Sequence, residues 1–147
     1  MRRTLGFVLL TAAGMLPLRV IATPTQESLS KDKGLLLMRL VIATEETLAS
    51  TNKEYGNLID VMQSPAFPDA SQRTEVGLPA AMDVIDPSSA QTGNYLVRIT
   101  TSEDKKHFQA SLEPIDPKTC GPALFGDDRE FIYGGKVLGC PASGPLR

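Results

Sequence analysis

The feature that most constrains this chain is a pair of alternating segments within residues 93–114. In both segments an apolar residue recurs at every second position, so each predicted strand has one apolar face. These apolar positions are Tyr95, Val97, Ile99, Phe108, Ala110 and Leu112. The stretch 102–105 between them is short and polar, which favours a hairpin over a crossover connection. The pattern therefore predicts two antiparallel strands.

A second hairpin is predicted nearer the C-terminus. Its strands are expected at 123–125 and 130–133, and the segment 126–129 between them contains Gly and Asp, which tolerate turn conformations. Together the two hairpins predict a small antiparallel sheet of about four strands.

A helix is predicted over residues 31–54, ahead of the sheet. Ser30 can accept the first unpaired amides, and Gly56 can adopt the left-handed conformation that closes a helix. The many β-branched residues lower the intrinsic helix propensity, so this helix should depend on packing against the sheet. The face expected to pack contains Leu37, Leu40, Val41, Thr44, Leu48 and Tyr55.

The segment 57–92 shows weaker patterns. A short helical turn is predicted at 57–63, and a surface loop at 64–75, which lacks periodicity and contains two prolines. A second short helix is predicted at 78–86, with Pro79 in its first turn and Pro87 as its end.

The first 22 residues have the order of a secretory signal. Arg2 and Arg3 precede the apolar run 5–16, and a small-residue site at 20–22 follows. A helix that spans a bilayer needs about 20 apolar residues, and this run is shorter. We therefore expect cleavage between Ala22 and Thr23, a linker at 23–30, a single domain at 31–147, and a periplasmic, extracellular or cell-surface location. The alternative is an uncleaved membrane anchor.

The charge of the chain bears on its partners. The net charge is −2, and a product that starts at Thr23 would keep 12 basic and 17 acidic residues, a net charge of −5. An acidic chain of this kind is a poor match for nucleic acid.

The two cysteines, Cys120 and Cys140, are predicted to form a disulfide, since an exported chain folds in an oxidising compartment. Closing a loop of about 20 residues would stabilise the fold by roughly 3 kcal/mol. The alternative is a thiol pair for metal or redox chemistry. No Cys-x-x-Cys is present and His107 is the only histidine, so a tetrahedral site lacks ligands and no metal is predicted.

No catalytic group or cofactor is predicted. His107 is expected to be a solvated surface residue, because no nucleophile motif or phosphate-binding loop accompanies it. Asp127, Asp128 and Glu130 are interpreted as turn residues rather than calcium ligands, since the ion needs six or more oxygens. The pairs 45–46 and 105–106 are interpreted as solvated charges. A hydrolase that uses His107 or unpaired carboxylates is the least supported alternative.

Several motifs together resemble the type IV pilin and pseudopilin family. They are a helix ending near Tyr55, the sequence Gly93-Asn94-Tyr95 ahead of the sheet, a strand ending at Pro114, and the turn 125–128. The similarity covers 38–60 and 93–140. It implies a non-enzymatic structural subunit of a type IV pilus or type II secretion system, with other pilin-like subunits or assembly proteins as partners. In that family the disulfide-bounded C-terminal region shapes subunit contacts.

The N-terminus departs from the pilin pattern of Gly followed by Phe-Thr-Leu-x-Glu. Gly6 and Phe7 are present, but Thr11 stands where the Glu belongs, and Pro17 and Arg19 interrupt the apolar segment. Prepilin-type processing would cut between Gly6 and Phe7, as an alternative to the Ala22 site. The predicted function is an exported structural protein similar to a minor pilin or pseudopilin. The alternative is a soluble periplasmic or secreted binding module that uses residues 57–92.

Overall fold

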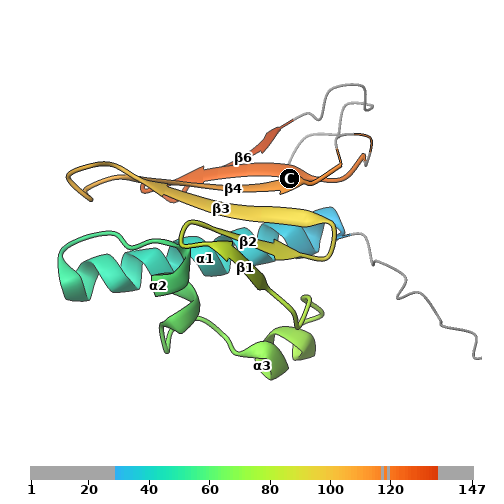
Figure 1. Cartoon of the computed structure of the whole chain (residues 1–147), viewed down its shortest axis with the longest axis horizontal. Helices are drawn as coiled ribbons and strands as arrows, with labels where there is room; N and C mark the ends of the chain where they lie inside the picture. Colours follow the sequence, from blue (N-terminus) through green and yellow to red (C-terminus); the bar gives the residue numbers. More distant parts are fainter. Residues whose placement is uncertain (1–28, 117, 119, 136–147) are drawn as a thin grey trace, which may run out of the picture.

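A computed structural model describes residues 29–116, 118 and 120–135 of the chain. Within these residues three helices precede an antiparallel sheet of six strands, which is an α+β fold (Figure 1). The helices are α1 (Lys31–Asn52), α2 (Leu58–Gln63) and α3 (Ala70–Glu75). The strands are β1 (Asp83–Asp86), β2 (Ser89–Thr92), β3 (Tyr95–Thr101), β4 (Phe108–Pro114), β5 (Ala123–Asp127) and β6 (Ile132–Gly135).

The sheet is a meander in which each strand pairs antiparallel with the next one along the chain. The β3–β4 hairpin predicted from the alternation is confirmed, with Tyr95 opposite Pro114 and Thr101 opposite Phe108. All six predicted apolar positions of this hairpin are buried on one face. In the second predicted hairpin, β5 extends to Asp127 and β6 starts at Ile132, so the turn lies two residues later than expected.

The expectation of about four strands was wrong, because β1 and β2 occupy part of the middle region. A helix was expected over 78–86, but the last four of these residues form strand β1. Asp86 explains the change locally: its carboxylate accepts hydrogen bonds from the Ser88 amide and the Ser89 hydroxyl, which closes a tight turn between two strands. The predicted loop at 64–75 also contains a helix, α3, which starts with a capping box formed by Asp69 and Gln72.

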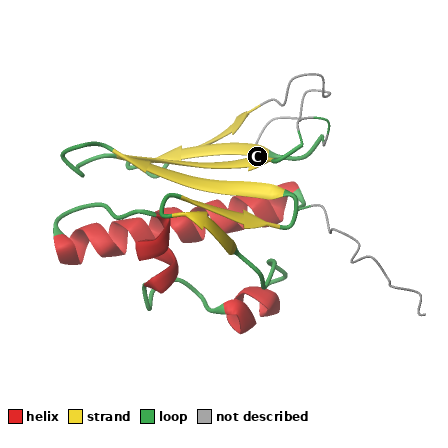
Figure 2. Cartoon of the chain, viewed as in Figure 1, coloured by secondary structure: helices red, strands yellow, loops and turns green. Residues whose placement is uncertain are grey.

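The core lies between one face of the sheet and α1, which runs along that face (Figure 2). The buried stripe of α1 consists of Gly34, Leu37, Met38, Val41, Ile42, Thr44 and Glu45. Leu40 and Leu48, which the helical pattern placed in the packed face, are only partly buried. Compared with the predicted orientation, the helix is therefore rotated about its axis, and Met38 and Ile42 point at the sheet in place of Leu40 and Leu48.

Two glycines allow α1 to approach the sheet closely. A Cβ atom at Gly126 of β5 would lie 2.6 Å from Cδ1 of Ile42, and one at Gly34 would lie 3.1 Å from Cδ2 of Leu112. Larger side chains at these positions would force the helix and the sheet apart.

Arg73 holds the connection between α2 and β1 in one conformation. Its side chain is buried, and its guanidinium donates hydrogen bonds to three backbone carbonyls, those of Pro68, Pro79 and Ala80. It also stacks over the ring of Phe67, 5.6 Å from the ring centroid. Burial lowers the pKa of Arg73. Arg73 thus joins the two ends of a segment that has no sequence periodicity.

Candidate functional site

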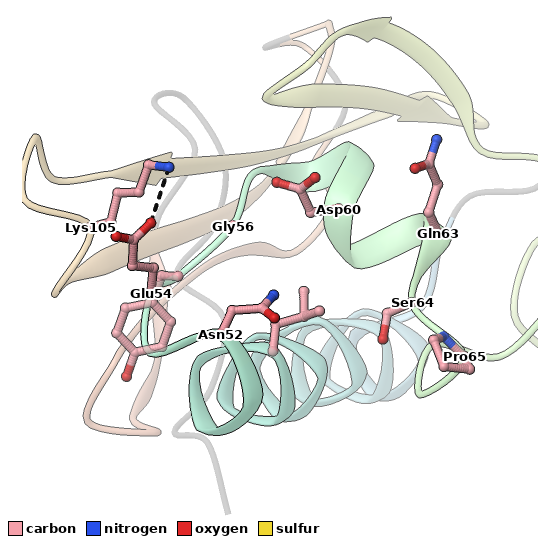
Figure 3. A pocket seen from close by; sticks show the side chains of 10 residues that line it. Asn52, Glu54, Gly56, Asp60, Gln63, Ser64, Pro65 and Lys105 are labelled. Atoms are coloured by element: carbon pink, nitrogen blue, oxygen red, sulfur yellow. Dashed lines mark ion pairs between the residues drawn. The ribbon is translucent and has the colours of Figure 1, made fainter.

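The candidate site is a polar pocket of about 370 Å³ where α1 ends and α2 begins, beside the β3–β4 hairpin (Figure 3). We call residues 53–57 the junction loop and this cavity the junction pocket. In Figure 3 the pair Glu54 and Lys105 lies at one side of the pocket, and Gln63, Ser64 and Pro65 lie at the other. Its lining residues are Leu48, Asn52, Glu54, Tyr55, Gly56, Asp60, Gln63, Ser64, Pro65 and Lys105.

The junction loop starts where Lys53 adopts a left-handed conformation with φ of 65°, and its amide donates to Ala49 O. Lys53 therefore closes α1, rather than Gly56 as expected, and the helix ends at Asn52 instead of 54. Gly56 is needed for a different reason. A Cβ atom there would lie 2.8 Å from Cβ of Asp60, whose carboxylate forms the capping box of α2 with Asn57.

Four contacts tie the junction loop to the β3–β4 hairpin. The amide of Tyr55 donates to Lys105 O at 3.0 Å, and the hydroxyl of Thr101 donates to Gly56 O at 2.9 Å. The ammonium of Lys106 donates to Lys53 O at 2.6 Å. Lys105 forms an ion pair with Glu54 at 3.3 Å, with both side chains more than half exposed, so this pair adds little stability.

Glu45 lies beneath the loop with no exposed surface. One carboxylate oxygen, Oε2, accepts a hydrogen bond from the amide of Gly56 at 3.0 Å. The other, Oε1, is buried and has no hydrogen-bond partner in the described part of the chain. Burial raises the pKa of Glu45 to about 7, the amide of Gly56 opposes this rise, and the charges of Asp60 and Glu46 add to it.

Tyr55 joins the loop to both layers of the fold. Its ring packs on Phe108 with the centroids 4.8 Å apart, and its hydroxyl donates to Oε1 of Glu46 at 3.0 Å. Burial, together with this hydrogen bond, raises the pKa of Tyr55 to about 12. The phenol therefore stays neutral at physiological pH and acts as a hydrogen-bond donor.

The chemistry of the junction pocket suits binding of polar groups rather than a reaction. Its charged groups are the Glu54–Lys105 pair and Asp60, which also caps α2. Asn52, Gln63 and the backbone supply further donors and acceptors.

His107 lies outside this pocket, at the start of β4. Its Nδ1 lies 2.6 Å from Oδ2 of Asp128, and the hydrogen bond and charge of Asp128 raise the pKa of His107. The hydroxyl of Ser102 accepts from the backbone amide of His107 and contacts Asp104. Ser102 thus interacts with the His107 backbone and not with its imidazole, so these residues do not form a nucleophile and a base.

The acidic residues at the end of β5 and in the turn that follows form ion pairs. Asp127 binds Arg129, which lowers the pKa of Asp127, and Asp128 binds His107. Within the described ranges no group of three His, Cys, Asp or Glu side chains is arranged to hold a metal ion.

No described helix covers the sheet face opposite α1, which we call the open face, and it carries a second depression, of about 490 Å³. The strand registers align one row of side chains across five strands, from β2 to β6: Ser89, Arg98, Ser111, Phe125 and Tyr133. Phe125 and Tyr133 are 41% and 50% exposed, and Phe131 nearby is 60% exposed. Exposed aromatic side chains that gather beside polar residues are typical of a contact surface.

Among the predicted site residues, Cys120 lies exposed ahead of β5. Cys140, the processing positions Ala22 and Thr23, and the alternative positions Gly6 and Phe7 lie outside the described residues.

Comparison with known proteins returns no match: no family model fits the chain, and no curated protein or solved structure is significantly similar to it. Of the helices that the structure describes, none combines the length and apolar character needed to cross a bilayer.

Sequence reasoning missed Glu45 and Arg73. Glu45 was interpreted as solvated, but it follows Val41 by four residues, so the helical period places it on the buried stripe. That spacing could have identified it. Arg73 has no comparable signal, because its partners are backbone carbonyls that the folded loop brings together.

Proposed function

We propose that this protein is an exported, non-enzymatic structural subunit similar to a minor type IV pilin or a type II secretion pseudopilin. The observation that carries the proposal is the architecture: the long helix α1 lies along one face of an antiparallel meander, and no other described helix covers the opposite face (Figure 1). The exposed aromatic residues on β5, β6 and the turn between them are then available to neighbouring subunits. The motifs of the pilin resemblance lie in this same helix and sheet.

The disulfide between Cys120 and Cys140 is part of this proposal. In the β5–β6 ladder Ala123 is opposite Gly135. Cys120 precedes Ala123 by three residues and Cys140 follows Gly135 by five, and segments of these lengths are long enough for a bridge to close from this end of the ladder.

Reduction should therefore destabilise the protein. We expect the reductant to lower the free energy of unfolding by roughly 3 kcal/mol, because the unfolded chain regains the entropy of an open loop. Thermal melts with and without reductant, alongside a thiol count, test this. Two reactive thiols in the untreated protein, with an unchanged melt, would rule out the bridge.

The proposed function is tested by the N-terminal residue, mass and assembly state of the protein recovered from its native host. A chain that starts at Phe7, especially a methylated one, and sediments with filaments or assembly proteins supports the proposal. A soluble monomer that starts at Thr23 contradicts a filament role.

The second candidate function is a soluble binding module. It is favoured by the junction pocket, to which the 57–92 region contributes Asp60, Gln63, Ser64 and Pro65. Release at Thr23 would make this candidate the leading one, with polar small molecules or peptide groups as the class of ligand.

A further inference from the structure

We propose that Glu45 is a proton-controlled latch, which holds the junction loop against α1 when its carboxyl group is neutral and releases the loop when it is ionised. This inference is independent of the proposed function, since it concerns only the contacts of one buried side chain.

The geometry places Glu45 at the meeting point of three elements. Its hydrogen bond to the amide of Gly56 links α1 to the junction loop, between residues 11 positions apart. The carbonyl of Gly56 accepts from Thr101 of β3, so the same residue also links the loop to the sheet. Gly56 also lies close to α2, since a Cβ atom added to it would come within 2.8 Å of Cβ of Asp60. A change at the Glu45 carboxyl therefore acts on a residue that contacts α1, α2 and β3.

The groups around Glu45 disfavour its charged form. Asp60 of α2 and Glu46 of α1 both repel a negative charge there. Its Oε1 atom is buried without a partner among the described residues, so within this part of the chain an ionised carboxylate would accept a hydrogen bond at Oε2 alone, from the amide of Gly56. A buried charge with so little compensation is costly.

The cations near the loop are engaged elsewhere. Lys105 pairs with Glu54 of the loop, and Lys106 donates to the carbonyl of Lys53. Lys53 itself directs its ammonium to Ser50 O, and His107 pairs with Asp128. These interactions point the positive charges of the hairpin and loop toward other acceptors and leave Glu45 facing acids.

The sign of the pH dependence follows from the raised pKa of Glu45. The folded protein keeps this proton up to about pH 7, whereas the unfolded chain loses it near the ordinary value of 4.5. The contribution of Glu45 to stability is therefore greatest below pH 4.5, falls as the pH rises between these two values, and levels off above about 7. Above that point hydration of the carboxylate favours the open loop.

Opening would change the junction pocket, because Glu54, Tyr55 and Gly56 form part of its wall. The pocket would thus have a closed form at mildly acidic pH and a more open form at alkaline pH.

The test is an NMR titration of the 147-residue chain between pH 5 and pH 9, following the amide of Gly56 and the side-chain carboxyl of Glu45. We expect both signals to titrate with a midpoint near 7. At one unit above the midpoint the ionised form exceeds the neutral form about tenfold. Exchange protection of the Gly56 amide, corrected for intrinsic rates, should fall by a comparable factor.

Glu45→Gln keeps the shape of the side chain and removes its titration, so the pH dependence at Gly56 should disappear. Glu46→Gln is the matched control: it removes a neighbouring carboxylate on the same helix and should leave a midpoint that is lowered but present.

The latch is overturned if Gly56 shows the same titration in Glu45→Gln, or if the Glu45 carboxyl titrates at or below pH 5. The latch is also overturned if the Glu45 carboxyl titrates near pH 7 while the exchange protection of the Gly56 amide stays unchanged. The carboxyl measurement uses the unsubstituted protein, so it decides the question even if the variant does not fold.

Discussion

Replacing Leu112 by alanine is expected to lower the free energy of unfolding by about 2–5 kcal/mol, because it leaves a cavity in a packed core. Leu112 has no exposed surface, lies opposite Val97 and Leu124 in the sheet, and faces Gly34 of α1. The close approach of α1 at Gly34 leaves the backbone there little freedom to collapse into the space. Chemical denaturation monitored by circular dichroism would measure the loss.

Leu96→Ala is the matched control for this substitution. Leu96 lies on the same hairpin, on the open face of β3, and is partly exposed. We expect it to lower the free energy of unfolding by about 1 kcal/mol or less. Equal losses in the two variants would contradict the packing of α1 on the face that contains Leu112.

Replacing Arg73 by alanine is expected to cost about 2–4 kcal/mol, because three backbone carbonyls lose their donors in a partly buried site. The connection between α2 and β1 should also become a target for proteolysis, since Arg73 joins its two ends through the carbonyls of Pro68, Pro79 and Ala80. Denaturation measures the global loss, and limited proteolysis with mass spectrometry locates the opened segment. Arg73→Lys should recover little, because an ammonium cannot reproduce the planar, forked geometry of a guanidinium that serves three carbonyls.

The control for Arg73 is Arg98→Ala, which removes an exposed arginine from the open face of the sheet. We expect a change within about 0.5 kcal/mol and no new cleavage sites. Cleavage within residues 67–82 at the same rate in both variants would mean that Arg73 does not order this segment.

Much of the sheet could be predicted from the sequence, because the two faces of a strand alternate residue by residue. The β3–β4 hairpin and its buried face follow from that alternation alone. Strands β1 and β2 could not be found in the same way. Strand β1 is exposed along its whole length, so its residues carry no burial pattern, and Pro79 suggested a helix start that the structure does not contain.

The candidate site was less predictable than the fold. The sequence showed a helix followed by a second helical turn, and the structure has both, as α1 and α2. The pocket between them depends on the left-handed conformation of Lys53 and on the β3–β4 hairpin, which folds back onto the junction loop. The hairpin residues that contact the loop lie about 50 positions after it in the chain. Contacts of such sequence separation leave no local signal.

The sequence by itself determined the properties that depend on neighbours along the chain: the alternation of β3 and β4, the helical period of α1, and the turn chemistry of Asp86 and Asp69. The tertiary structure alone decided the environments of Glu45 and Arg73. The helical period places Glu45 on the buried stripe, but its partner Gly56 comes from beyond the end of the helix. Arg73 is buried among carbonyls of its own loop, which only the folded loop brings together. The free energy of a buried charge depends on the groups that surround it in space, and only the folded chain brings Gly56, Asp60 and the carbonyls around Arg73 into place.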